Sequence, residues 1–437
     1  MSAPPSGRPV VRPVVRPRSP AAAGLVGVLA LAVTVLMSPP AQAKDPAQVR
    51  AQSQEQCNTQ QARYVDQPAS YLTELGFTRA WSLAQGRGVT VAVVDSGVDV
   101  RNPHLAGDKV LPGKSFISGA ATEDLLGHGT AVASIIAGRL RQDKASAQIG
   151  AAPQARILPV RVFAYDKSFE DSIPADQLFA PDTARIAAGI RWAADNRADV
   201  INVSMSTPPT DPALPVLKAA VAHAVDKGVV VVASTGDQLN GQQSTQLRYP
   251  AAFPGVLGVA ANNAQGSVDD FSVHGAHADV TAPGANVLIA FGQAGDCLAG
   301  DKQPYTSWST GFVSALAAML KERFPKASVA DIGYRITASA DRPQQGARDD
   351  LEGWGTIQPY DALTMSMDPR RAGPVFPGAK GPVQPPVQSA DVKALKVTPD
   401  PLAPARNAAL WWGLLTVGLA ALALIARPLV GRIVSRR

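Results

Sequence analysis

Cysteine is scarce in this sequence: Cys57 and Cys297 are the only two among 437 residues. No histidine or further cysteine lies beside either of them at the spacing of a metal-binding motif, which argues against a cysteine-based metal site. We therefore predict no metal ion at these residues and no cofactor. Whether the two cysteines pair with each other depends on the compartment in which the chain resides.

Acidic residues are absent from the first 43 residues, which are instead rich in arginine. Four arginines fall within residues 8–18, an uncharged apolar run follows at 21–37, and Ala41-Gln42-Ala43 has the small-x-small pattern of a cleavage site. This order of segments predicts a secretory signal peptide over residues 1–43. An uncleaved membrane anchor is the alternative, because the apolar run is nearly long enough to span a bilayer.

Charged residues are also absent from residues 408–426. The length of this apolar run is close to the roughly 20 residues that cross a hydrocarbon layer, and it is followed by an arginine-rich tail at 427–437. We predict a single transmembrane helix rather than a buried core helix, with the tail in the cytoplasm. The protein is thus expected in the plasma membrane, with everything between the two apolar segments on the extracytoplasmic side.

The excess of positive charge belongs to these two ends. The chain has 41 basic and 35 acidic residues, and removing the eight arginines of segments 1–43 and 427–437 leaves 33 basic residues. The part between them is close to neutral, so there is no electrostatic case for a nucleic acid partner.

Export also bears on the cysteines, because thiols outside the cytoplasm are usually oxidised. We predict a Cys57–Cys297 disulfide, with two free buried cysteines as the alternative. Such a bond would tie an N-terminal extension at 44–74, which is too short to fold alone, to a main domain at 75–365. The proline-rich residues 366–407 predict an extended linker between that domain and the membrane.

Within the main domain, apolar runs of the strand type alternate with helical stretches. Strands are predicted at 89–94, 157–162, 200–203 and 229–232, and helices at 130–138, 183–196, 212–227 and 308–324. This alternation predicts an α/β fold of three layers, with a central, mainly parallel sheet covered by helices on both faces. Functional residues of such a fold are expected at the carboxyl ends of the strands.

Three short motifs supply an acid, a base and a nucleophile. Asp95 ends a buried strand, His128 lies between two glycines at the start of a helix, and Ser307 lies at the start of another helix. Each motif alone is also typical of a turn or a helix cap. Together they match the Asp-His-Ser triad, in which the carboxylate orients the imidazole and the imidazole takes the serine proton. The chain order Asp, His, Ser is the one found in subtilisin.

These motifs, Asp95-Ser-Gly, Gly127-His-Gly-Thr and Thr306-Ser, resemble the three signatures of subtilisin-like (subtilase) peptidases. Further similar segments are Ile201 to Ser206, which resembles the strand lining the substrate cleft, and Thr281-Ala-Pro-Gly. The resemblance implies a subtilisin-like fold and peptide-bond hydrolysis through an acyl-enzyme. It also implies a substrate cleft formed by residues Ser204, Met205, Ser206, Ser234 and Gly236.

Within the subtilases, the whole arrangement resembles a mycosin, the membrane-anchored protease of actinobacterial type VII (ESX) secretion systems. The segments that resemble the mycosins are Ala80-Trp81, Gly150-Ala-Ala-Pro, Arg156 to Arg161, the proline-rich linker and the single C-terminal helix. The resemblance implies exported protein substrates, association with the type VII secretion membrane complex, and an N-terminal extension packed on the domain.

Three positions depart from the family pattern. Asp237 stands where subtilases have the asparagine that donates to the oxyanion, Tyr305 replaces a glycine and Gly311 replaces a proline. An ionised aspartate would repel the oxyanion, and only a protonated one could donate. The alternative function is therefore a weakly active or inactive subtilase fold that serves as a structural subunit. The histidines outside the triad are interpreted as surface or loop residues: His104, His223, His274 and His277.

Overall fold

The computed structural model describes residues 64–66, 70–141, 143, 146–164, 179–238, 245–268, 271–292, 295–300, 303–342, 346–379, 412 and 416. The chain divides into two compact units. The larger unit comprises residues 1–342 and 349–368 and holds all the helices and strands given below, whereas the smaller comprises 343–348 and 369–437. Of the described residues of the smaller unit, 346–348 and 369–379 form turns and irregular backbone.

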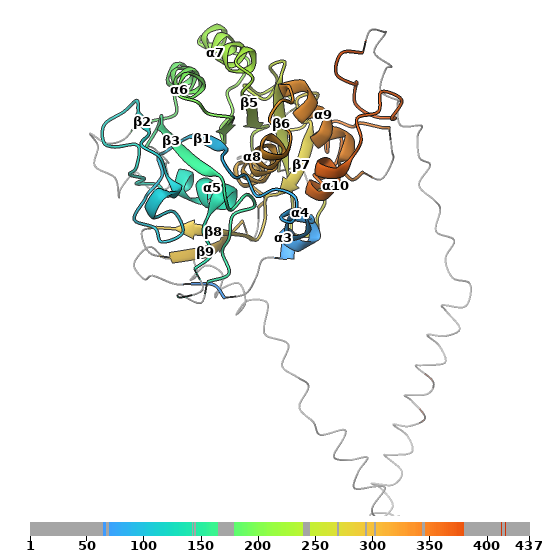
Figure 1. Ribbon diagram of the computed structural model, residues 1–437, viewed down its shortest axis with the longest axis horizontal. Coiled ribbons are helices and arrows are strands. Elements are labelled where there is room, and N and C mark those ends of the chain that lie inside the picture. Colours follow the sequence, from blue (N-terminus) through green and yellow to red (C-terminus); the bar gives the residue numbers. More distant parts are fainter. Residues whose placement is uncertain are drawn as a thin grey trace, which may run out of the picture. The chain divides into compact units, whose positions relative to one another are not determined.

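The larger unit is built on a seven-stranded sheet in the order β2-β3-β1-β4-β5-β6-β7 (Figure 1). The strands are β1 (Thr90–Asp95), β2 (Lys114–Ser115), β3 (Arg156–Arg161), β4 (Val200–Val203), β5 (Val230–Ser234), β6 (Val256–Asn262) and β7 (Val280–Pro283). Every neighbouring pair in this sheet is parallel. Residues of β1 and β5 are buried throughout, as expected for parallel strands covered on both faces.

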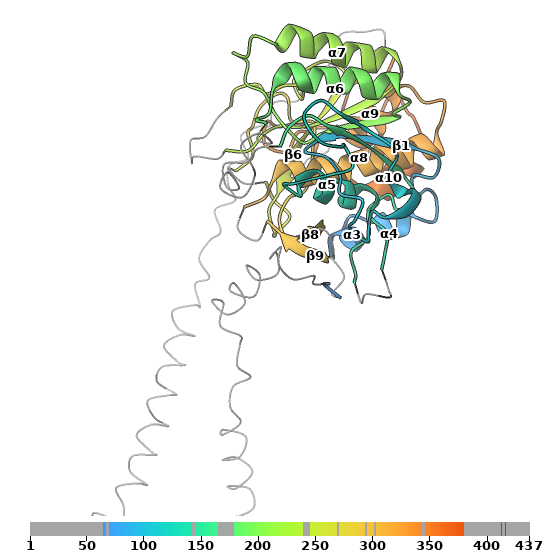
Figure 2. The same ribbon diagram turned by 90° about the vertical axis from the view of Figure 1, so that its left-hand side faces the viewer.

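Helices cover both faces of the sheet, and each face has its own apolar core. Alternate residues of β1 divide between the two cores, with Val91 and Val93 in one and Ala92 and Val94 in the other. The first core includes α5 (His128–Ala137), α8 (Thr306–Arg323), α9 (Val329–Ser339) and α10 (Pro359–Thr364). The second includes α6 (Thr183–Asp195) and α7 (Leu214–Asp226), which lie side by side over the sheet (Figure 2). The predicted three-layer α/β fold is confirmed.

An antiparallel hairpin, β8 (Val287–Phe291) and β9 (Gly295–Ala299), packs against the first core beside α5. Two short helices, α3 (Ser70–Glu74) and α4 (Phe77–Ala80), precede β1, and a 3₁₀ turn, η1 (Gly107–Lys109), precedes β2. Within the N-terminal extension, the Val65 amide donates to Asp296 of β9 at 2.6 Å, and Tyr71 contributes to the first core. This part of the extension therefore lies on the domain.

The four predicted strands and four predicted helices are all present, with ends that differ by at most two residues. Residues 408–426, predicted to cross the membrane, fall outside the described residues apart from positions 412 and 416. No helix in the described part of the chain combines the length and apolarity that a membrane crossing requires. The signal peptide at 1–43 and most of the linker at 366–407 also lie outside the described residues.

Candidate active site

Asp95 is the last residue of β1 and is fully buried. Its Oδ1 accepts hydrogen bonds from the Ser96 amide at 2.8 Å, the Ser96 hydroxyl at 3.2 Å and His128 Nδ1 at 2.7 Å. Among the described residues, Oδ2 has no hydrogen-bond partner. The carboxylate is thus held against the imidazole by the end of a central strand.

His128 is the first residue of α5, and its side chain is 28% exposed. The glycines on either side of His128 are required for different reasons. Gly127 adopts a left-handed φ of 79°, whereas a Cβ on Gly129 would lie 2.1 Å from the Gly97 carbonyl oxygen. Gly129 therefore permits a close approach of the Gly97 backbone, and Gly127 only permits the turn.

The pKa of His128 is raised above its usual value. Burial disfavours the imidazolium and lowers the pKa, but the charge and the hydrogen bond of Asp95 together outweigh it. The charges of Asp124 and Asp237 act in the same direction as Asp95. An imidazole in this setting readily accepts a proton, which is the property a general base requires.

Asp124 is a site residue that the sequence analysis did not identify. It is buried, and its Oδ2 accepts from the amide and hydroxyl of Thr130 at 2.8 and 2.7 Å. Its Oδ1 accepts from the Ser96 hydroxyl at 2.9 Å and the Gly127 amide at 2.9 Å. Burial raises the pKa of Asp124, although these hydrogen bonds oppose the shift. This carboxyl joins the turn after Asp95 to the first turn of the helix that carries His128.

Ser307 is the second residue of α8 and is buried, with 7% exposure. Its carbonyl accepts a hydrogen bond from the Ser204 hydroxyl at 3.1 Å. The next residue, Trp308, lies against the imidazole of His128, with ring centroids 5.1 Å apart and ring planes inclined by 33°. The structure thus brings the start of α8 to the His128 side chain. No hydrogen bond joins the Ser307 hydroxyl to His128 in the described part of the chain.

Asp237 follows β5 and reaches the start of α8. Its Oδ1 accepts from the Thr306 amide at 3.0 Å and from the Thr306 hydroxyl at 2.7 Å. The Thr306 hydroxyl also lies 2.6 Å from the Ser234 hydroxyl. Burial raises the pKa of Asp237 to about 6, against the hydrogen bonds from Thr306 and the charge of His128, which lower it. Thr306 was part of a motif, but this contact was not predicted.

Tyr305 is accommodated by aromatic neighbours. Its ring meets Phe271 edge to face, with centroids 5.5 Å apart, and Trp308 at 6.4 Å. Gly311, which replaces a proline, faces α5, where a Cβ would lie 3.0 Å from Ile135 Cγ2. Phe163 also lies near His128, with ring centroids 6.4 Å apart. The imidazole of His128 therefore lies among aromatic side chains.

The residues predicted to form the substrate cleft have two kinds of environment. Ser204 and Ser234 are buried, and their hydroxyls contact Ser307 and Thr306. Met205 and Ser206 are partly exposed, and a Cβ on Gly236 would lie 2.5 Å from the Ser206 hydroxyl. The first two support the start of α8 at Thr306 and Ser307, which leaves Met205 and Ser206 as the members of this set that are open to a ligand.

Three of the histidines other than His128 are buried. His104, His274 and His277 lie in loops, in agreement with the prediction of surface or loop positions, but none of the three is at the surface. His104 Nδ1 lies 2.7 Å from the Arg139 carbonyl and Nε2 lies 3.1 Å from Asp296 Oδ2. Polar partners from distant segments, which sequence spacing does not reveal, make this burial possible.

Cys297 on β9 is buried and disulfide-bonded. Cys57 lies outside the described residues, so the Cys57–Cys297 pairing remains a prediction. In the part of the chain that the structure describes, there is no group of three or more His, Cys, Asp or Glu side chains that could hold a metal.

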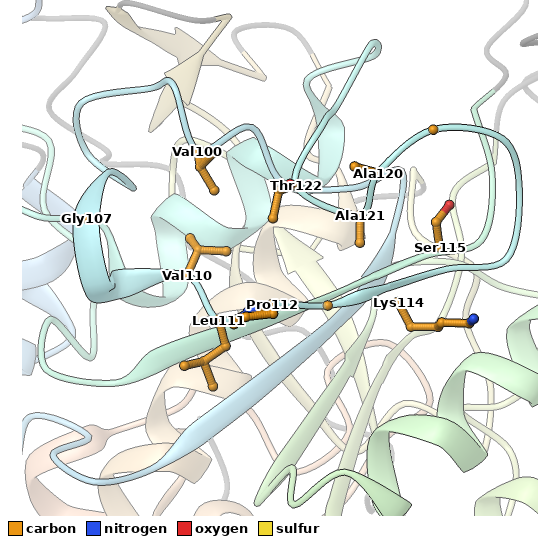
Figure 3. A pocket seen from close by; sticks show the side chains of 12 residues that line it. Val100, Gly107, Val110, Leu111, Pro112, Lys114, Ser115, Ala120, Ala121 and Thr122 are labelled. Atoms are coloured by element: carbon orange, nitrogen blue, oxygen red, sulfur yellow. The ribbon is translucent and has the colours of Figure 1, made fainter.

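A cavity of about 640 Å³ lies apart from these residues, next to β2. Its lining comes from the loop after β1, from η1 and β2, and from residues 119–122 (Figure 3). Val100 and Val110 point toward Thr122 across it. None of the candidate site residues lines this cavity, so it has no part in the chemistry considered below.

Comparison with known proteins agrees with this geometry. Residues 86–355 match the Subtilase family. Mycosin-1 of Mycobacterium tuberculosis is 35% identical over 337 residues, which cover 68% of this chain and 73% of the relative.

Two solved structures extend the likeness. The crystal structure of MycP1 with the N-terminal propeptide removed is similar at a TM-score of 0.58 and 30% identity, covering 69% of this chain and 99% of that one. A chain of an intact ESX-5 inner membrane complex is similar at a TM-score of 0.59 and 27% identity, covering 82% of this chain and 90% of that one. The family match spans well over half of the chain, and the chain therefore belongs to the subtilase family of serine endopeptidases, within which it is similar to the mycosins.

Proposed function

We propose that the protein is a membrane-anchored, extracytoplasmic serine endopeptidase of a type VII secretion system, and that it processes exported proteins. Asp95 orients His128, His128 takes the proton of Ser307, and Ser307 attacks the peptide carbonyl to form an acyl-enzyme. Water then releases the acyl group with His128 as the base. The observation that carries the proposal is the 2.7 Å contact between buried Asp95 Oδ1 and His128 Nδ1.

The position of Ser307 supports its role as the nucleophile. The start of α8 places the backbone N–H of Ser307 and the positive end of the helix dipole beside the hydroxyl, where negative charge develops during attack. The hydrogen bond from the Ser307 hydroxyl to His128 is absent here, and such catalytic bonds often tighten only when substrate is bound. Trp308 limits the freedom of the imidazole on one side.

A fluorophosphonate activity probe tests this proposal on the full chain in detergent. We expect labelling of the wild type that disappears in Ser307→Ala. Ser309→Ala is the matched control, because it removes another buried hydroxyl from the same helix, one that bonds to the Ala282 carbonyl at 2.9 Å. Labelling that survives in Ser307→Ala, or no labelling of folded wild type at any pH between 4 and 9, would reject the endopeptidase mechanism.

A second candidate function is that of a structural subunit with little or no catalysis. It is favoured by the similarity to a chain of the ESX-5 inner membrane complex, which covers 82% of this chain and so exceeds the family domain. Asp237 in the oxyanion position also favours it. Recovery of an intact membrane complex from cells that express only Ser307→Ala would show that assembly needs the fold and not the nucleophile.

A further inference from the structure

We infer that Asp237, in its protonated form, donates the hydrogen bond that stabilises the oxyanion in this protein. The inference rests on the proposed endopeptidase function and concerns how the site works despite the missing asparagine. It makes the carboxyl of Asp237 a catalytic group rather than a substitution that impairs the site. It also implies that the enzyme works only within a limited range of pH.

The backbone around Asp237 is held rigidly beside the nucleophile. The Gly236 carbonyl accepts from the Val273 amide at 2.8 Å, and the Gln238 amide donates to the Phe271 carbonyl at 2.7 Å. Gly236 has a φ of 94°, and its amide donates to the Ser234 hydroxyl at 2.9 Å. The side chain of Asp237 therefore starts from a fixed point, with the segment that includes residues 271–273 on one side and α8 on the other.

The hydrogen bonds of Asp237 determine which oxygen faces the reaction. Oδ1 already accepts from both the amide and the hydroxyl of Thr306, the residue before Ser307. Any further bond must be made through Oδ2, which has no hydrogen bond to the described residues. Asp237 is only partly buried, so it is not sealed off from the cleft. An asparagine in this pose would accept with its oxygen and donate with its nitrogen, and a carboxyl does the same only when Oδ2 carries a proton.

The charged and titratable groups around Asp237 come from three directions. His128 of α5 has the one charge that lowers the pKa of Asp237, and burial outweighs it. The side chain of Arg248 lies near Gly236, since a Cβ there would be 3.5 Å from Arg248 Cγ. His277 Nε2 lies 3.4 Å from the Thr235 carbonyl. With a pKa of about 6, Asp237 is protonated in a range that a secreted enzyme can reach.

Catalysis then requires opposite protonation states of the two groups. His128 has to be neutral to accept the proton of Ser307, and Asp237 has to be protonated to donate to the oxyanion. The pKa of His128 is raised above 6.5 and that of Asp237 is about 6, so a single proton shared by the two groups lies mostly on His128. The active form, in which this proton lies on Asp237 and His128 is neutral, is therefore the minor one. Its population is greatest between the two pKa values and falls on both sides.

Rates of inactivation by a fluorophosphonate, measured on the full chain in detergent from pH 4 to 9, test this inference. We expect a bell-shaped profile for the wild type. Asp237→Asn keeps the donor at every pH, so its rate should rise with deprotonation of His128 and then stay constant. At pH 8, it should exceed the wild type on the order of 10²-fold, the usual effect of one oxyanion donor. Asp237→Ala should be slow throughout and should lack the alkaline fall.

The outcomes separate the inference from the proposed function. A wild-type rate that stays constant up to pH 9, or an alkaline fall that persists in Asp237→Asn, would overturn the inference while leaving Ser307 as the nucleophile. No Ser307-dependent labelling in either protein would overturn the proposed function itself. If Asp237→Asn does not fold, which its melting curve reveals, the wild-type profile alone decides, because an ionised Asp237 predicts the alkaline fall.

Discussion

The Asp237 carboxyl accepts two hydrogen bonds from Thr306, the residue directly before Ser307, across 69 positions of the sequence. A loop that follows one strand thereby supports the first turn of the helix that carries the nucleophile. Tyr305, the N-cap residue of this helix, provides no side-chain cap of its own. Asp237 therefore fixes the start of α8 whether or not it carries a proton, and this has a measurable effect on stability.

We expect Asp237→Asn to raise the melting temperature at neutral pH and not at acid pH. The folded pKa is raised from 3.8 to about 6, so ionising the carboxyl is harder in the folded protein than in the unfolded chain. Wild-type stability should then decline as pH rises from about 4 to 6, and remain lower above that range. Calorimetry of both proteins from pH 3.5 to 8 measures this. A difference in melting temperature that does not vary with pH would contradict the assigned shift.

Asp95→Asn should lower the pKa of His128 and slow labelling of Ser307 by about 10⁴-fold. The carboxylate raises the pKa of the imidazole through its charge and its hydrogen bond, and without it burial dominates. NMR titration of the His128 ring measures the first effect, and probe kinetics measure the second. Asp99→Asn is a suitable control, because that buried aspartate pairs with Arg101 outside the site. An unchanged His128 titration would show that Asp95 does not govern the imidazole.

Asp124→Ala should destabilise the fold on the order of 2–4 kcal/mol, because it leaves several buried donors without an acceptor. It should also slow catalysis, since the turn that positions His128 loses its support. Asp124→Asn retains one acceptor oxygen and should be intermediate in both respects. Denaturant unfolding and probe labelling give the two quantities. A variant with normal stability but slow labelling would instead place Asp124 in the chemistry.

Asp296→Ala should loosen the N-terminal extension where it meets the domain. The carboxylate accepts from the Val65 amide at 2.6 Å, and also contacts His104 and the Ser146 hydroxyl. Hydrogen exchange at residues 64–66 should become faster, while exchange in β1 stays slow. Asp226→Ala, at an exposed position of helix α7, serves as the comparison. Equal protection of Val65 in both variants would mean that other contacts hold the extension.

A chain that ends at residue 407 should leave the membrane fraction and appear in the soluble extracytoplasmic fraction. The reason is the loss of the apolar run at 408–426, which we propose as the only anchor after removal of residues 1–43. Fractionation of cells followed by immunoblotting detects the change. Retention of the shortened chain in the membrane would indicate that the apolar segment at 21–37 is not cleaved.

Four of the seven strands of the sheet were predicted, because they are short apolar runs, whereas β2, β6 and β7 were not predicted. Both ends of β4 were predicted correctly, and those of β1 to within one residue. Short continuous apolar runs of this kind are typical of strands that are buried on both faces of a parallel sheet. The β8–β9 hairpin was missed, because its second strand begins with Gly295, Asp296 and Cys297 and lacks the alternation of apolar and polar residues that is typical of a strand. α9 was missed as well, although its capping box of Ser328 and Asp331 is a local signal that could have identified its start.

The candidate site was predictable only as far as local motifs reach. Asp95, His128 and Ser307 each lie in a recognisable pattern, and β1, α5 and α8 place them as those patterns imply. The roles of Asp124 and Thr306 depend on contacts between segments, which spacing alone cannot show. An aspartate four residues before the histidine, followed by Thr130, was the available hint for Asp124. The burial of His104 depended on Asp296, which lies 192 positions away.

The contact between Trp308 and His128 gives the protein an internal optical signal. An indole ring 5.1 Å from an imidazole loses fluorescence when the imidazole becomes cationic, because the cation accepts an electron from the excited indole. The emission of this one tryptophan should therefore follow the charge on His128 without any added dye. Comparison with Trp308→Phe isolates its contribution from that of the other five tryptophans. Protonation of the general base could then be recorded by light, in the absence of substrate.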